Sequence, residues 1–259
     1  MDILTFTYPL NAVLMIGVPI AVGYYLTRRF AQGWGIWFLG VVTFLMAQIG
    51  SGFFTRAVNS LVAESAASWP LVSQMIFDGL FLGLSAALWE EGIRYAVLRW
   101  WAKDVRSRRE GIMMGAGHGG AMAIVLGIFA LFYVSQMFRY RNADLSAIVP
   151  ADQLAYAQAE VERFWSQPWY FTLLNALESA SFLMVNIGLA ALVMRTFVEK
   201  RAAWFLLALV LHFVIASGRE LGMAFLGPYW TEALLLLAGG LCLLPVFLWR
   251  ETKESETAI

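Results

Sequence analysis

Four polar groups lie inside otherwise apolar segments of this chain, each group in a different segment. Each is about 8–11 residues from the nearest loop rich in basic residues, or roughly 12–16 Å of helix. Ionisable groups at such a depth in a membrane are costly and mark functional interiors. We therefore expect the groups to meet at one depth and to form a reaction centre. They are Glu90 with its neighbours Glu91 and Arg94, His118, Asn186, and His212.

The composition is that of a membrane protein. Of the 259 residues, 60% are hydrophobic and only 14% are charged, whereas soluble domains contain about 25% charged residues. The net charge is zero, which gives no reason to expect nucleic acid as a partner. The single cysteine, Cys242, provides no disulfide framework or thiolate metal site. The first ten residues lack a basic region, so we expect no cleavable signal peptide.

Seven segments are apolar and long enough to cross a bilayer. We expect an all-α protein with one domain over residues 1–250, a polytopic transmembrane helical bundle, followed by a polar tail at 251–259. The sixth segment is interrupted by Gly218, Arg219 and Glu220, so it is either a short span or a broken helix that lines a cavity. The third helix is expected to continue past its apolar stretch through Glu90 and Arg94, because no helix breaker follows. The expected apolar spans are Tyr8–Thr27, Ile36–Phe54, Pro70–Trp89, Ile112–Phe132, Phe171–Val193, Trp204–Ile215 and Thr231–Leu248.

Basic residues predict the orientation of the bundle. Most of the 18 Lys and Arg residues lie in loops on one side, and the positive-inside rule places that side in the cytoplasm. The N-terminus is then outside, the C-terminus cytoplasmic, and the protein a multi-pass protein of a prokaryotic cell membrane. An amphipathic helix near residues 150–165 is expected to lie on the outer membrane surface. The basic residues of the cytoplasmic side are Arg28, Arg29, Arg99, Lys103, Arg106, Arg108, Arg109, Arg195, Lys200, Arg201, Arg250 and Lys253.

The Glu-Glu pair has the spacing of a general base with a supporting ion pair. Glu90 is four residues and Glu91 three residues from Arg94, so either carboxylate can reach the guanidinium. Adjacent helical residues point about 100° apart, so only one of the two can face Arg94 squarely. The other carboxylate is then available to accept a proton. A simple salt bridge near the membrane edge also explains this motif.

The remaining polar residues have structural explanations when each is taken alone. Glycines flank His118 on both sides, and small residues in membrane helices allow close packing of neighbouring helices. His118, Asn186 and His212 could each form an interhelical hydrogen bond. The common depth of all four groups favours a functional site instead.

With these residues named, the chain resembles the YhfC-type family of intramembrane peptidases, within the wider group that includes the CAAX prenyl endopeptidases. The likeness runs from about Trp89 to Ala216. It rests on the order of Glu90-Glu91-Gly-Ile-Arg94, the run Gly115 to Gly120 around His118, then Glu178, Asn186 and His212.

The resemblance implies an intramembrane endopeptidase that opens toward the cytoplasmic leaflet and cleaves a membrane protein or peptide in the lipid bilayer. Glu90 would activate water, with Glu91 and Arg94 as its positioned partner pair. His118 would orient the water, while His212 and Asn186 would stabilise the oxyanion.

The chain departs from the family pattern at several positions, and these departures weaken the expectation of a bound metal ion. Met122 stands where an acidic residue is usual, Asn186 where a histidine is usual, and Ala190 where a serine is usual. A zinc site takes three protein ligands. A ligand histidine also needs a partner for its second nitrogen, and the apolar Met122 cannot be that partner for His118. We therefore expect a glutamate-dependent reaction without a metal or other cofactor.

Two functions of other classes stay open. The departures would suit a pseudo-peptidase that keeps the fold and binds without cleaving. Asp78 and Glu178 are further intramembrane acids, and together with the four polar groups they would suit a small transporter with a polar path.

Overall fold

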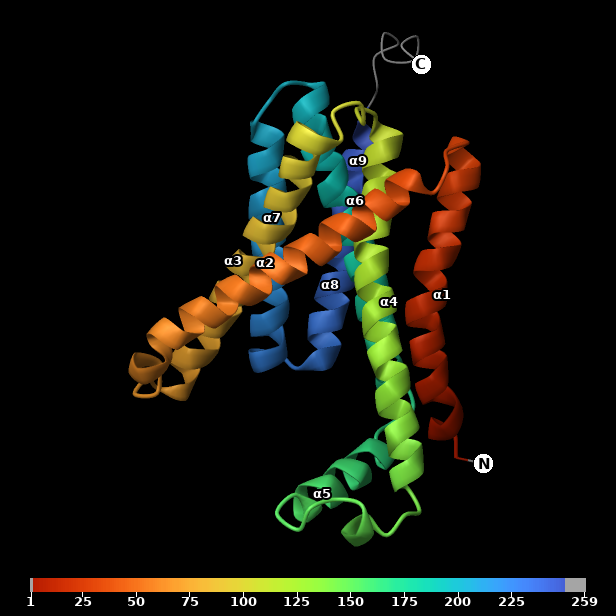
Figure 1. The fold of residues 1–259 in the computed structure, drawn as a ribbon, viewed down its shortest axis with the longest axis vertical. Coiled ribbons are helices and arrows are strands. Elements are labelled where there is room, and N and C mark those ends of the chain that lie inside the picture. Colours follow the sequence, from red (N-terminus) through yellow and green to blue (C-terminus); the bar gives the residue numbers. More distant parts are fainter. Residues whose placement is uncertain (1, 250–259) are drawn as a thin grey trace.

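A computed structural model describes residues 2–249, so Arg250, Lys253 and the expected tail at 251–259 lie outside the described residues. Within this range the protein is all-helical, and seven helices are long and apolar enough to cross a membrane, which confirms the expected number (Figure 1). The helices are α1 (Leu4–Phe30), α2 (Gly35–Ala66), α3 (Leu71–Ala96), α4 (Arg108–Tyr140), α5 (Leu154–Trp165), α6 (Leu174–Val198), α7 (Ala203–Phe225), α8 (Pro228–Cys242) and α9 (Leu244–Leu248).

The sixth span is one unbroken helix. α7 continues from Ala203 through Gly218, Arg219 and Glu220 to Phe225. The expectation of a short or broken helix was wrong because Arg219 and Glu220 face protein partners, as described below, and so do not force the chain out of the bundle. A charge within a span is tolerated where it is paired inside the protein.

The successive spans alternate in direction, so the loops after α1, α3 and α6 lie at one end of the bundle together with α9 (Figure 1). We call this the basic end, because these loops and the adjoining helix ends carry Arg28, Arg99, Lys103 and Lys200 among other cations. The N-terminus and α5 lie at the opposite end. α5 is the helix expected between the fourth and fifth spans, and its Phe164 is buried against the ring of Tyr8.

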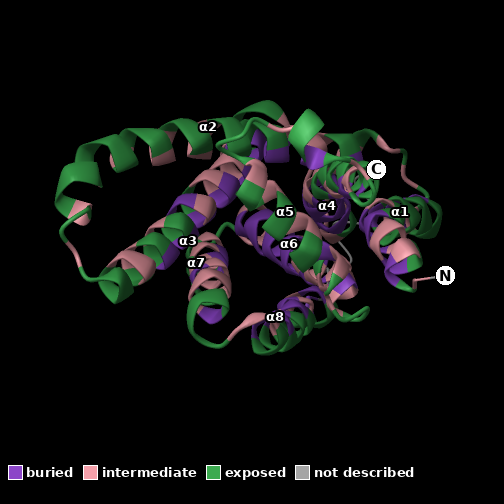
Figure 2. Ribbon diagram, turned by 90° about the horizontal axis from the view of Figure 1, so that it is seen from below, coloured by how far each residue is buried: buried purple, intermediate pink, exposed green. Residues whose placement is uncertain are grey.

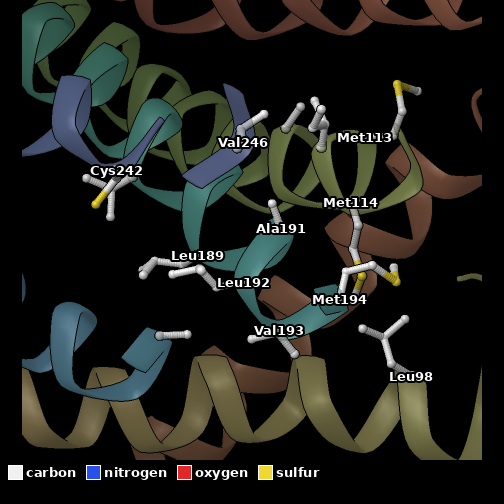
Figure 3. Close-up of a cluster of buried hydrophobic side chains, with 14 of the residues drawn as sticks. Leu98, Met113, Met114, Leu189, Ala191, Leu192, Val193, Met194, Cys242 and Val246 are labelled. Atoms are coloured by element: carbon white, nitrogen blue, oxygen red, sulfur yellow. The ribbon is translucent and has the colours of Figure 1, made fainter. Parts of the chain in front are cut away.

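The α6 helix is the most buried of the spans, and Figure 2 shows buried residues along it, with other helices around it. Its half nearer the basic end belongs to the main hydrophobic core. Figure 3 shows this core, in which Leu98, from the π-helical turn Val97–Trp101 that follows α3, and Met113 and Met114 of α4 surround α6. The α6 residues are Leu189, Leu192, Val193 and Met194. These residues are packed with essentially no exposed surface.

Glycines allow α4 to lie directly against two other helices. A methyl group on Gly117 would meet the carbonyl oxygen of Trp37 in α2 at 1.9 Å, and one on Gly115 would meet that of Asn186 in α6 at 2.5 Å. Only glycine fits such close backbone approach, as the small residues of membrane helices commonly show. This packing fixes His118 between α2 and α6.

Candidate active site

The structure brings together all six residues singled out above, from four helices. Each is less than 10% exposed, so the group lies in the interior of the bundle. We call them the reaction centre. They are Glu90, Glu91 and Arg94 of α3, His118 of α4, Asn186 of α6 and His212 of α7.

Arg94 is the hub of the buried charges. Its guanidinium donates through Nη1 to Oε1 of Glu91 and through Nη2 to Oδ1 of Asn186. The Oε2 atom of Glu90 lies farther away, 3.4 Å from Nη2. Glu91 is therefore the paired carboxylate and Glu90 the freer one. The amide nitrogen of Asn186 donates to the carbonyl of Phe182 at 3.0 Å, so this residue orients Arg94.

A threonine sets the tautomer of His118. The hydroxyl of Thr43 donates its only proton to the carbonyl of Gly40 at 2.7 Å, so it can only accept from Nδ1 of His118, 3.0 Å away. Nδ1 therefore carries hydrogen, and Nε2 of the neutral ring has a lone pair. That lone pair faces Oε2 of Glu90 at 2.9 Å. Sequence reasoning missed Thr43.

Glu91 does the same for His212. Nδ1 of His212 is 2.6 Å from Oε1 of Glu91, and because a carboxylate only accepts, Nδ1 is the donor. Nε2 of the neutral ring then has a lone pair, which lies 3.8 Å from Oε2 of Glu90. In this tautomer His212 can donate to an oxyanion only after Nε2 is protonated.

The Nε2 atoms of both imidazoles thus face Oε2 of Glu90, so that three acceptor atoms lie close together. With neutral imidazoles, two carboxylates face one guanidinium, so the reaction centre lacks one positive charge. Buried charge must be compensated. Either a proton shared with Glu90 or a metal cation completes this arrangement.

A cavity of about 660 Å³ reaches Glu90, Asn186 and His212. On every helix that lines it, the lining residues run from the reaction centre away from the basic end: Ala86 and Gly83 on α3, Met122 and Phe129 on α4, Phe182 and Glu178 on α6, and Ala216 and Arg219 on α7. The hydrophobic core fills the other direction. The sequence predicted a site open toward the basic end, whereas packed side chains close that end and the cavity extends in the opposite direction.

The mouth of the cavity faces sideways. Leu45 of α2 and Leu126 and Phe129 of α4 line it and are also among the exposed large hydrophobic residues. Apolar residues exposed on a membrane span contact lipid. The cavity therefore opens toward the lipid-facing surface between α2 and α4.

Comparison with known proteins agrees with the resemblance. A family model described as YhfC intramembrane metalloprotease matches residues 14–221. The chain belongs to this family. It is also 24% identical, over 209 residues, to an uncharacterized membrane protein YhfC of Bacillus subtilis (strain 168), covering 78% of this chain and 79% of that protein. No solved structure matches the chain.

The family name implies a metal, and the donor set of this chain fits one. Glu90, His118 and His212 would be the three ligands, and Thr43 and Glu91 already occupy the second imidazole nitrogens as metal sites require. The premise that His118 lacks such a partner was wrong, since Thr43 supplies it in place of Met122.

The distances between the donor atoms are close to those of a metal site but do not match them. Ligands of one tetrahedral zinc ion lie about 3.3 Å apart, between the 2.9 and 3.8 Å separations found around Oε2 of Glu90. Accordingly, no three acidic, histidine or cysteine side chains of residues 2–249 already form a metal-binding group. The side chains would have to shift before all three could bind one ion.

Proposed function

We propose that this protein is an intramembrane endopeptidase whose reaction centre hydrolyses a peptide bond beside Glu90. The observation that carries the proposal is the convergence of one carboxylate and two imidazole lone pairs at the closed end of a laterally open cavity. Its substrate is a membrane-embedded protein or peptide that enters from the lipid phase.

Each residue of the reaction centre has a defined task in this proposal. Glu90 presents Oε2 to the cavity, and in the metal-free reaction it accepts a proton from the attacking water. Arg94 pairs with both glutamates and compensates one of their two negative charges, and Asn186 holds its guanidinium in place. Thr43 and Glu91 fix the two imidazoles so that Nε2 of each faces Glu90.

A metal, when bound by Glu90, His118 and His212, would activate water and polarise the scissile carbonyl. In that state Glu90 serves as a ligand. The glutamate-dependent reaction without metal is the second candidate, and the 2.9 Å hydrogen-bond distance between Glu90 and His118 favours it. Both candidates require Glu90, and the metal content of the protein distinguishes them.

A transporter needs a polar path across the whole membrane. The cavity does continue toward the α5 end, but the packed core over Leu98, Met114 and Leu192 separates the reaction centre from the basic end. This separation favours hydrolysis over transport.

The test is cleavage in a defined bilayer. The purified protein is reconstituted with model transmembrane peptides, and the products are identified by mass spectrometry. We expect one main cleavage site within the membrane, lost in Glu90→Gln. Cleavage that continues in Glu90→Gln would contradict the proposal. A folded protein that binds these peptides and never cleaves them would instead support the pseudo-peptidase alternative.

A further inference from the structure

A second cluster of charged side chains lies where this cavity meets a smaller one. We call it the distal cluster, and it comprises Glu178 of α6, Arg219 and Glu220 of α7, and Glu232 of α8. Arg219 donates through Nε to Glu178 at 2.8 Å and through Nη1 to Glu220 at 2.9 Å. Two carboxylates therefore pair with one guanidinium. With Glu232 as a third acid, the cluster has an excess of negative charge when all three are ionised.

Glu232 is the member that these ion pairs do not satisfy. It is 3% exposed, and its Oε2 atom has no hydrogen-bond partner among the residues that the structure describes. A buried carboxylate oxygen without a partner is costly. Glu232 lines a cavity of about 310 Å³ together with Glu178 and Arg219. This position therefore suits a cationic ligand that enters the cavity.

The distal cluster is continuous with the reaction centre. Glu178 and Arg219 line both this smaller cavity and the one that reaches Glu90. Glu178 precedes Asn186 by eight residues on α6, and Arg219 follows His212 by seven on α7, or roughly 10–12 Å of helix. An extended peptide covers about 3.3 Å per residue, so three to four residues would span this distance.

We propose that the distal cluster is a specificity subsite for a cationic group of the substrate, three to four residues from the scissile bond. The group is the side chain of Lys or Arg, or a free N-terminal amine. Glu232 contacts it, and Arg219 positions Glu178 beside it. This inference rests on the proposed function, because it describes how the same cavity selects its peptide.

Binding measurements test the subsite without relying on turnover. A series of transmembrane peptides made of Leu and Ala contains one Lys each, at a position that shifts by one residue from peptide to peptide. Each is compared with a peptide that has Met at the same position. Binding is measured in nanodiscs with the Glu90→Gln protein. We expect one or two adjacent positions at which Lys binds at least about tenfold tighter than Met, as for close charge pairs at interfaces. Peptides with free and acetylated N-termini distinguish an amine from a side chain.

Variants of the protein then locate the preference. Glu232→Gln and, separately, Glu178→Gln should bring the Lys-to-Met ratio close to one. Asp78→Asn is the matched control, because Asp78 is an exposed acid within α3 that lines neither cavity. It should keep the preference. Thermal unfolding shows whether each variant is folded.

The outcomes separate this inference from the proposed function. Equal binding of Lys and Met peptides at every position would overturn the subsite, and would indicate instead a proton shared between Glu232 and Glu178. A preference that persists in both glutamine variants would overturn it as well. Cleavage that depends on Glu90 without any Lys preference keeps the peptidase and removes the subsite. A Lys preference without cleavage by the unmodified protein keeps the subsite and removes the peptidase.

Discussion

Oε2 of Glu90 and Nε2 of His118 lie 2.9 Å apart, and both atoms are acceptors when the imidazole is neutral. The relationship follows from Thr43, whose hydroxyl has no proton left for Nδ1 of His118. A cation is required between two such atoms. The chemistry of the site therefore depends on whether that cation is a proton or a metal ion.

Substitution of the two adjacent glutamates should have different effects, one on cleavage and the other on stability. Glu90→Gln should reduce cleavage by at least about 100-fold while the protein stays folded, because Glu90 is the carboxylate that faces the cavity. Glu91→Gln removes the buried partner of Arg94 and His212, which should lower the free energy of unfolding by about 3–5 kcal/mol. Peptide cleavage and thermal unfolding, measured on both variants, check this. Equal loss of stability in the two would refute the division of roles.

Thr43→Val should remove the hydrogen bond that orients His118, while Val keeps nearly the volume of the Thr43 side chain. Loss of the acceptor for Nδ1 should lower metal affinity about 10- to 100-fold if a metal is bound. The control is Thr27→Val. The Thr27 hydroxyl likewise donates to its own helix, at the carbonyl of Tyr24, and it lies near the end of α1, a helix that contributes nothing to the reaction centre. Metal titration of both variants gives the comparison. Identical affinities would show that Thr43 does not orient His118.

Elemental analysis decides between the two candidate reactions. The lone pairs of His118 and His212 next to Glu90 lead us to expect one zinc per protein chain, contrary to the sequence-based expectation of no metal. His118→Ala and His212→Ala should each lose it, and chelators should stop cleavage by the unmodified protein. If the protein contains no zinc and cleaves in the presence of chelators, Glu90 accepts the proton of water directly.

Hydropathy was enough to predict the seven spans, because helices in lipid must satisfy their own backbone and carry long apolar runs. The common depth of Glu90, His118, Asn186 and His212 predicted that they meet. Thr43 could not be found this way, since a threonine hydroxyl bonded to its own helix has no signature in the sequence. The direction of the cavity depends on how Met114 and Leu192 pack, which no local pattern encodes.

The glycines of α4 should be required for packing of the reaction centre. Gly117→Ala places a methyl group 1.9 Å from the Trp37 carbonyl, so α2 must move away, and we expect a loss of about 1–3 kcal/mol of stability or more. Gly17→Ala is the control because open space surrounds its position on α1. It should be neutral or stabilise slightly. Chemical or thermal unfolding of both variants in detergent measures the difference. A neutral Gly117→Ala would mean that α2 and α4 are not in close contact.

The orientation of the bundle remains a prediction from its basic loops, and cysteine labelling tests it. The single native Cys242 is buried at 6% exposure, so it should contribute little background. Lys103 at the basic end and Asp152 beside α5 are both exposed. In intact cells, an impermeant maleimide should label Asp152→Cys and spare Lys103→Cys until the membrane is opened, since basic loops stay in the cytoplasm. With that orientation the reaction centre lies nearer the cytoplasmic leaflet, while its cavity extends toward the outer one. Labelling of Lys103→Cys in intact cells would instead place the reaction centre nearer the outer leaflet and direct its cavity toward the cytoplasmic one.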